Sequence, residues 1–147
     1  LEAMSGREAG ADLAARKAYA AMAAGELRRE LIAAADDLAS RLPAGDAQVL
    51  DDRQQLIDAA MGDYTTAAES FAEAADGVRE DRWRLRTARA RALWGQYMLS
   101  ARTGRTDAAL LSQARTIIQE VLAENRDNPE YLPAVQIEKL LNVQPQA

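Results

Sequence analysis

The sequence predicts an all-α fold, and three observations carry this prediction. Alanine, the residue with the highest helix propensity, contributes 33 of the 147 residues. Proline and glycine, which interrupt helices, number only 4 and 8, and aromatic residues make up 5% of the chain. Apolar residues recur at spacings of three and four, which is the pattern of a helix with one apolar face. We therefore expect about seven antiparallel helices joined by short turns.

The first two helices are expected to meet at a glycine and to end at a proline-containing turn. Ser5 and Glu8 form a capping-box pattern that opens the first helix, and Gly25 ends it. The second helix ends at residues 42–45, because proline disfavours helical backbone in the residue before it. Its apolar residues form one stripe, which consists of Leu27, Leu31, Ala34, Ala35, Leu38 and Leu42.

The third and fourth helices are expected to meet at Gly62. Asp46 is the expected N-cap of the third helix, and Asp63 is the expected cap of the fourth. The fourth helix has the clearest helical periodicity of the chain and weakens at Gly77. The residues that carry this periodicity are Tyr64, Ala67, Ala68, Phe71, Ala74, Ala75 and Val78.

Three further helices are expected in the second half of the chain. Asp81 is the expected cap of the fifth helix, and Gly104 closes it. The sixth helix begins near Asp107 and runs to about residue 125. Residues 128–130 have the sequence Asn-Pro-Glu, which favours a new helix start because asparagine caps and proline suits the first helical position.

Glycines recur between the expected helices at regular intervals. Gly25, Gly62 and Gly104 are spaced by 37 and 42 residues, and periods of 20–50 residues indicate a solenoid of helical hairpins. An irregular helical bundle is the alternative.

Residues 62–74 resemble the second half of the tetratricopeptide repeat. The family has a turn glycine, an aromatic, a small residue, a large aromatic and a second small residue in the places of Gly62, Tyr64, Ala67, Phe71 and Ala74. Residues 104–110 repeat the turn and the small residue, and residues 128–134 resemble the turn between repeats. The tryptophan, leucine-glycine and tyrosine signature of the family's first helix is not matched.

The resemblance implies a degenerate tetratricopeptide-like α-solenoid over residues 5–142. It would consist of three helical hairpins and a C-terminal capping helix. We expect residues 1–4 to be an expression remnant or a cut end, and residues 143–147 to be a flexible tail.

An arginine-rich strip on the fifth helix is the candidate partner-binding site. Arg82, Arg86 and Arg89 fall on one helix face, with Gln96 two turns beyond. Guanidinium groups bind carboxylates through paired hydrogen bonds, and the resemblance implies that first helices of a hairpin line a concave binding surface. The alternative is a solvated face paired with neighbouring acids. Three nearby aromatics are expected in the core rather than in a stacking site: Trp83, Trp94 and Tyr97.

Composition excludes several classes of function. The chain has no cysteine and no histidine, so zinc sites of the Cys/His type and thiol or imidazole catalysis are excluded. Neighbouring acids at residues 36–37 and 51–52 point about 100° apart on a helix and are not expected to share a metal. We expect no catalytic residue, metal or cofactor. A net charge of −5 argues against nucleic acid, and no apolar stretch is long enough to insert into a membrane.

These observations predict a non-enzymatic scaffold that binds a segment of a partner protein, preferably an acidic one, in a concave groove. The alternative is an obligate subunit of a bacterial envelope or secretion assembly, which acts through homo- or hetero-oligomeric helix packing. A small-molecule sensor is a third class. Arginine outnumbers lysine by 16 to 2, which with the alanine content favours a GC-rich bacterial genome. No targeting segment is visible, so we expect a cytoplasmic protein, with a periplasmic domain as the alternative.

Overall fold

A computed structural model describes residues 6–42 and 47–143, and this part of the chain consists of helices and connecting turns. The all-α prediction is therefore confirmed. The helices are α1 (Gly6–Arg41), α2 (Ala47–Gly77), α3 (Arg82–Arg102), α4 (Ala108–Leu122) and α5 (Leu132–Leu141), with a 3₁₀ turn η1 (Pro129–Tyr131) before α5. Expectations for residues 1–4, for the caps Ser5 and Asp46 and for residues 144–147 lie outside the described residues. No helix in the described ranges combines the length and apolar composition that a membrane span requires.

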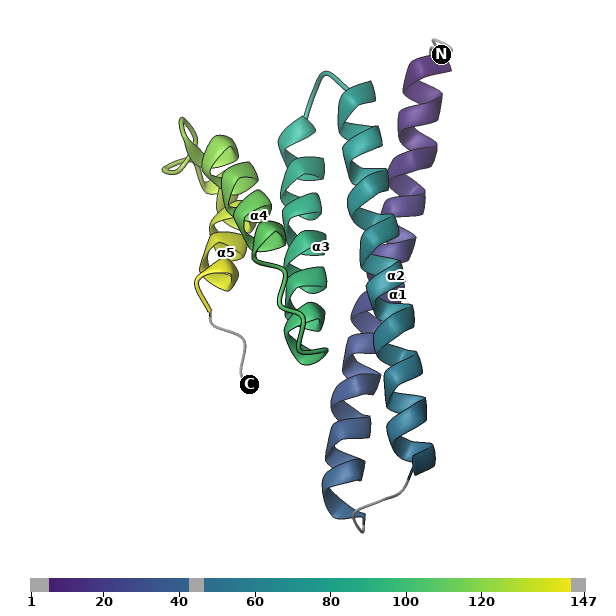
Figure 1. The fold of residues 1–147 in the computed structure, drawn as a ribbon. Coiled ribbons are helices and arrows are strands. Elements are labelled where there is room, and N and C mark those ends of the chain that lie inside the picture. The colour runs from purple at the N-terminus through teal and green to yellow at the C-terminus, as the bar shows by residue number, and fades with distance from the viewer. Residues whose placement is uncertain (1–5, 43–46, 144–147) are drawn as a thin grey trace.

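Each helix packs mainly on the one before it (Figure 1). The two longest, α1 and α2, form an antiparallel hairpin, and α3 lies along the other side of α2. The shorter α4 and α5 follow on the far side of α3, where α5 lies behind α4 in the view of Figure 1. Helix α1 also approaches α3 locally, and α5 contacts α3. As a result, α3 has neighbours on almost every side.

Two predicted turns are wrong, so five α-helices replace the expected seven in the described part of the chain. Gly25 lies inside α1 and Gly62 lies inside α2. Glycine in a helix interior costs only about 1 kcal/mol relative to alanine. Each glycine has a residue of high helix propensity on at least one side, so the helix continues across it. Residues 62–74 therefore belong to one uninterrupted helix.

The second half of the chain follows the prediction closely. Gly104 adopts a φ of 76° in the turn after α3, a conformation that glycine favours. The side chain of Asp107 accepts a hydrogen bond from the amide of Ala109 at 3.1 Å, and Asn128 caps η1 in the same way. The cap predicted at Asp81 is wrong, because this residue has a left-handed φ of 55° and its side chain makes no cap hydrogen bond.

The core is built from large residues of α2 that pack on small residues of its neighbours. Tyr64 and Phe71 are fully buried, as the periodicity of this segment predicts. The Tyr64 ring lies against Gly25 of α1 and Gly95 of α3, where a methyl group in place of the glycine hydrogen would lie 3.3 and 2.7 Å from ring atoms, respectively. These two glycines let three helices approach one another at one aromatic ring. Most of the buried residues of α1 are also small; the full set is Ala11, Ala14, Ala18, Met22, Gly25 and Ile32.

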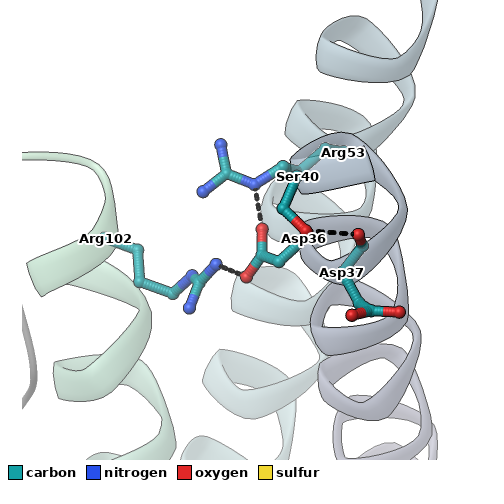
Figure 2. Close-up of polar contacts among 5 residues, drawn as sticks. All are labelled: Asp36, Asp37, Ser40, Arg53 and Arg102. Carbon is teal, nitrogen blue, oxygen red and sulfur yellow. Dashed lines mark hydrogen bonds and ion pairs between the residues drawn. The ribbon is translucent and has the colours of Figure 1, made fainter. Parts of the chain in front are cut away.

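Asp36 of α1 joins three helices through ion pairs (Figure 2). One carboxylate oxygen accepts from Arg53 of α2 and the other accepts from Arg102 of α3. The neighbouring Asp37 points away and pairs with Arg41 of its own helix at 3.2 Å. The two acids therefore do not share a site, as the sequence predicts.

We expect Asp36→Asn to lower the free energy of unfolding by about 1 kcal/mol, because a network of partly exposed ion pairs contributes in this range. The loss should shrink in 1 M salt, which screens charges. Asp37→Asn is the matched control, since its exposed pair within one helix contributes about 0.3–0.5 kcal/mol. Urea denaturation of both variants at two salt concentrations measures the difference. Equal losses for the two variants would show that Asp36 does not join the helices energetically.

Candidate partner-binding groove

A groove of about 330 Å³ runs over α3 between α1 and α5. Alternate helices form its floor and walls: α3 forms the floor, Tyr19 is the wall residue from α1, and α5 forms the other wall. We call it the α3 groove. The residues that line it are Tyr19, Trp83, Arg84, Thr87, Ala88, Arg91, Pro133, Gln136 and Ile137.

Two arginines and one hydroxyl lie along the floor of the α3 groove. Arg84, Thr87 and Arg91 follow one another at spacings of three and four residues, so they share one face of α3. Arg84 pairs with Glu130 at 3.2 Å and Arg91 donates to Glu26 at 2.8 Å. A guanidinium group has five N–H donors, so each arginine keeps donors for a further acceptor. Thr87 Oγ1 is buried and has no hydrogen-bond partner among the described residues.

Aromatic rings give the groove an apolar component. Trp83 packs on Tyr131 with ring centroids 4.2 Å apart, and the Arg84 guanidinium lies 4.7 Å from the Trp83 ring centroid. On the opposite wall, Tyr19 packs edge-on against Phe71 and is half exposed. These contacts hold both rings in place, so they present fixed surfaces to a ligand.

The four residues predicted to bind a partner lie away from the α3 groove. Arg86 and Arg89 are each two residues from a groove arginine, which places them about 200° around the helix. Arg86 pairs with Glu120 of α4, and Gln96 donates to Thr65 of α2 at 2.6 Å. The two side chains thus join α3 to its neighbours.

The remaining two predicted residues have different surroundings. Arg82 donates to the carbonyl oxygen of Val78 at 2.9 Å and lines a second cavity, of about 830 Å³, between the start of α1 and the end of α2. That cavity mixes acids and arginines and carries no single sign of charge. Arg89 is half-buried, and its Nε makes no hydrogen bond within the described residues. The four predicted residues share one face of α3, as their spacing predicts, but Arg86 and Gln96 are already bonded to Glu120 and Thr65.

The aromatic residues follow the core prediction in two of three cases. Trp94 and Tyr97 are buried in α3, whereas Trp83 is half-buried and lines the α3 groove. The indole of Trp94 stacks under Arg29 of α1, whose guanidinium carbon lies 4.8 Å from the ring centroid. This contact belongs to the same crossing of helices as Tyr64.

Sequence reasoning missed the groove face of α3. Arg84 and Arg91 belong to the arginine-rich segment, but the spacing of Arg84, Thr87 and Arg91 next to Trp83 is the signal that marks their common face. Tyr19 and the residues of α5 could not be found, because only the fold brings them to α3. No cluster of three or more potential metal ligands occurs within residues 6–42 and 47–143.

Comparison with protein-family models, with curated proteins and with solved structures finds no match for this chain. The resemblance of residues 62–74 to the tetratricopeptide repeat stays a prediction, and the functional argument rests on the geometry of the groove.

Proposed function

We propose that this protein is a non-enzymatic interaction module that holds a segment of a partner protein in the α3 groove. The observation that carries the proposal is the row of Arg84, Thr87 and Arg91 in a groove that is also lined by the aromatic side chains of Trp83 and Tyr19. The tetratricopeptide resemblance also implies a groove lined by alternate helices, but the turn that it places at Gly62 is absent, so the proposal rests on the groove alone.

The chemistry of the groove suits a segment that contains a carboxylate beside an apolar side chain. Arginine binds carboxylates through two parallel hydrogen bonds, and Trp83 and Tyr19 offer apolar surface at either side. A ligand with only one of these properties would leave part of the groove unused.

An open groove suits an extended segment better than a small molecule. Small-molecule pockets bury about 70–90% of their ligand. Here Tyr19, Arg84, Pro133 and Gln136 all remain exposed at the rim. A chain that lies along the groove can continue beyond both ends, which an enclosed cavity would prevent.

A random peptide library provides the test of this function. Selection on the protein should enrich peptides that combine aspartate or glutamate with an aromatic or aliphatic residue. Arg84→Gln and Arg91→Gln should each weaken binding of a selected peptide about tenfold, because a charge-assisted hydrogen bond contributes about 1.5–3 kcal/mol. Fluorescence titration measures the affinity, and circular dichroism checks that each variant keeps its helix content.

Arg86→Gln and Arg89→Gln are the matched controls on the opposite face of α3. They should leave peptide affinity within about twofold. A library without enrichment, or a loss of affinity that follows Arg86 and Arg89 instead, would contradict the assignment of the α3 groove and favour the strip predicted from sequence.

A further inference from the structure

The longest helix carries a second apolar face that remains open to solvent. Four leucines of α1 are between 46 and 69% exposed, although leucine is among the residues most often buried. Alanines separate them along the same side of the helix. We call this surface the outer stripe of α1, and its residues are Leu13, Ala20, Ala24, Leu27, Leu31 and Leu38.

The outer stripe lies opposite the face of α1 that packs on α2. Leu27 is two residues from the buried Gly25, which places it about 200° around the helix. Steps of four and three residues, taken alternately from Leu13 to Leu38, reach every member of the stripe. This is the seam of a two-stranded coiled coil, and it extends over about 38 Å. A helix with apolar residues on both sides is ordinarily covered on both sides.

We propose that a second copy of this chain covers the outer stripe, in an antiparallel pair of α1 helices. None of the stripe residues lines the α3 groove, so this inference is independent of the proposed function. The first argument for a second copy is the fit of side-chain sizes, and the second is the order of charges beside the stripe.

The sizes of the stripe residues match when the two helices run in opposite directions. In the register that aligns the two ends of the stripe, Leu31 meets Ala20 of the second copy and Leu27 meets Ala24 of the second copy. Each of these layers sets a large side chain against a small one, which fills space evenly. A parallel pair would instead set Leu27 against Leu27 and Ala24 against Ala24, so that layers of two leucines would follow layers of two alanines.

The charges beside the stripe favour the same register. Arg16 and Asp37 lie on one flank, and antiparallel packing places Arg16 of one copy opposite Asp37 of the other. Both side chains are exposed, and among the described residues their ion pairs lie within their own helix turns, with Asp12 and Arg41. Lys17 lies within the seam, where its ammonium group comes to the same level as Asp37 of the second copy, while a parallel pair would bring two Lys17 side chains together.

Sedimentation velocity over a range of concentrations tests the pairing. We expect a reversible dimer whose dissociation constant rises at least a hundredfold in Leu27→Lys/Leu31→Lys, because each substitution occurs twice in the interface. Both leucines are exposed in the monomer, so helix content should stay unchanged, and so should the unfolding midpoint at concentrations at which the parent chain is monomeric. Leu132→Lys is the control, since Leu132 is 54% exposed on α5 and lies outside the stripe. A chain that stays monomeric at every concentration, or a dimer that Leu132→Lys weakens equally, overturns the proposal.

An exchange of charges across the interface distinguishes specific pairing from non-specific hydrophobic association. Arg16→Asp should weaken the dimer about fivefold, and Arg16→Asp/Asp37→Arg should restore it, because the double variant again places opposite charges across the interface. A double variant as weak as the single one contradicts the register.

Disulfide cross-linking determines whether the two α1 helices run parallel or antiparallel. The chain has no cysteine, so Leu13→Cys and Leu38→Cys can be made singly without further changes. In an antiparallel pair, a mixture of the two variants should form disulfide-linked dimers under mild oxidation, while each variant alone should not. Cross-linking of each variant with itself would establish a parallel pair and overturn the proposal.

Discussion

An alanine at Gly95 is expected to lower the free energy of unfolding by about 1–3 kcal/mol, even though alanine is the better helix former. The new methyl group would lie 2.7 Å from atoms of the Tyr64 ring. That ring is fully buried and is held between α1 and α3, so it cannot move aside without shifting a helix. Overpacking of this kind outweighs the gain in helix propensity.

The same replacement at Gly62 is expected to have the opposite sign. Gly62 is exposed within α2, and a methyl group there meets no atom within 4 Å. Gly62→Ala should therefore raise the free energy of unfolding by about 0.5–1 kcal/mol. This control also tests whether Gly62 lies inside a helix. If Gly62 instead lay in a turn with positive φ, its replacement by alanine would destabilise the protein.

Urea denaturation followed by circular dichroism measures both variants. A further variant identifies the cause of the effect at Gly95: with Tyr64→Ala in the background, the Gly95→Ala change should become neutral or stabilising, since the ring that it meets is gone. An unchanged loss in that background would show that the Tyr64 ring is not the obstacle.

Alkaline pH is expected to destabilise the protein through Tyr64, with a loss of about 2–3 kcal/mol between pH 10 and pH 12. Burial and the nearby Glu26 carboxylate raise the pKa of Tyr64 from its ordinary value of 10.0 to about 12. The folded state therefore keeps the phenol proton after the unfolded state has lost it. The contribution of Tyr64 to the free energy of unfolding is fully present below pH 10. It is lost as the pH rises towards the pKa of Tyr64 in the folded state, by about 1.4 kcal/mol per pH unit.

Tyr64→Phe isolates this contribution, because phenylalanine keeps the ring and cannot ionise. The Tyr64 hydroxyl lies near Glu26 but makes no hydrogen bond of normal geometry in the described part of the chain, so the variant should be at least as stable at neutral pH. Unfolding free energies of both proteins, measured between pH 8 and pH 12, give the comparison. Parallel curves would show that Tyr64 does not ionise differently in the two states.

Glycines illustrate how far the sequence predicts the helices. Gly104 ends α3 as expected because the residues around it, Thr103 and Thr106, are weak helix formers. Gly25 is flanked by alanine and glutamate, and α1 continues through it. Its role is to admit the ring of Tyr64, a residue 39 positions away, and no local pattern reveals such a contact.

The apolar stripe predicted for residues 27–42 is present, but most of it faces solvent rather than α2. Four of the six buried residues of α1 are alanine or glycine, and Gly25 among them allows the close approach of the large Tyr64 side chain of α2. Hydrophobic size alone favours the leucines for the interior, so an interpretation based on periodicity selects the wrong face. The choice between two apolar faces depends on the partner helix, which the local sequence does not specify.

The candidate site shows the same limit. The sequence predicts an arginine-rich helix, and α3 is that helix. Which of its arginines remain available depends on α2, α4 and α5, which cover most of its surface. All three arginines form ion pairs, but Arg86 pairs with Glu120 of α4, whereas Arg84 and Arg91 also line the opening between α1 and α5.

Because each helix packs mainly on the one before it, the molecule can unfold locally from one end. The short α5 makes less extensive contacts than any other α-helix of the described chain, and it can detach while α1, α2 and α3 keep the contacts around Tyr64. Amide protons should therefore exchange fastest at the carboxyl end and slowest in the middle of α2 and α3. The same arrangement would let evolution add or remove terminal helices without rebuilding those that remain.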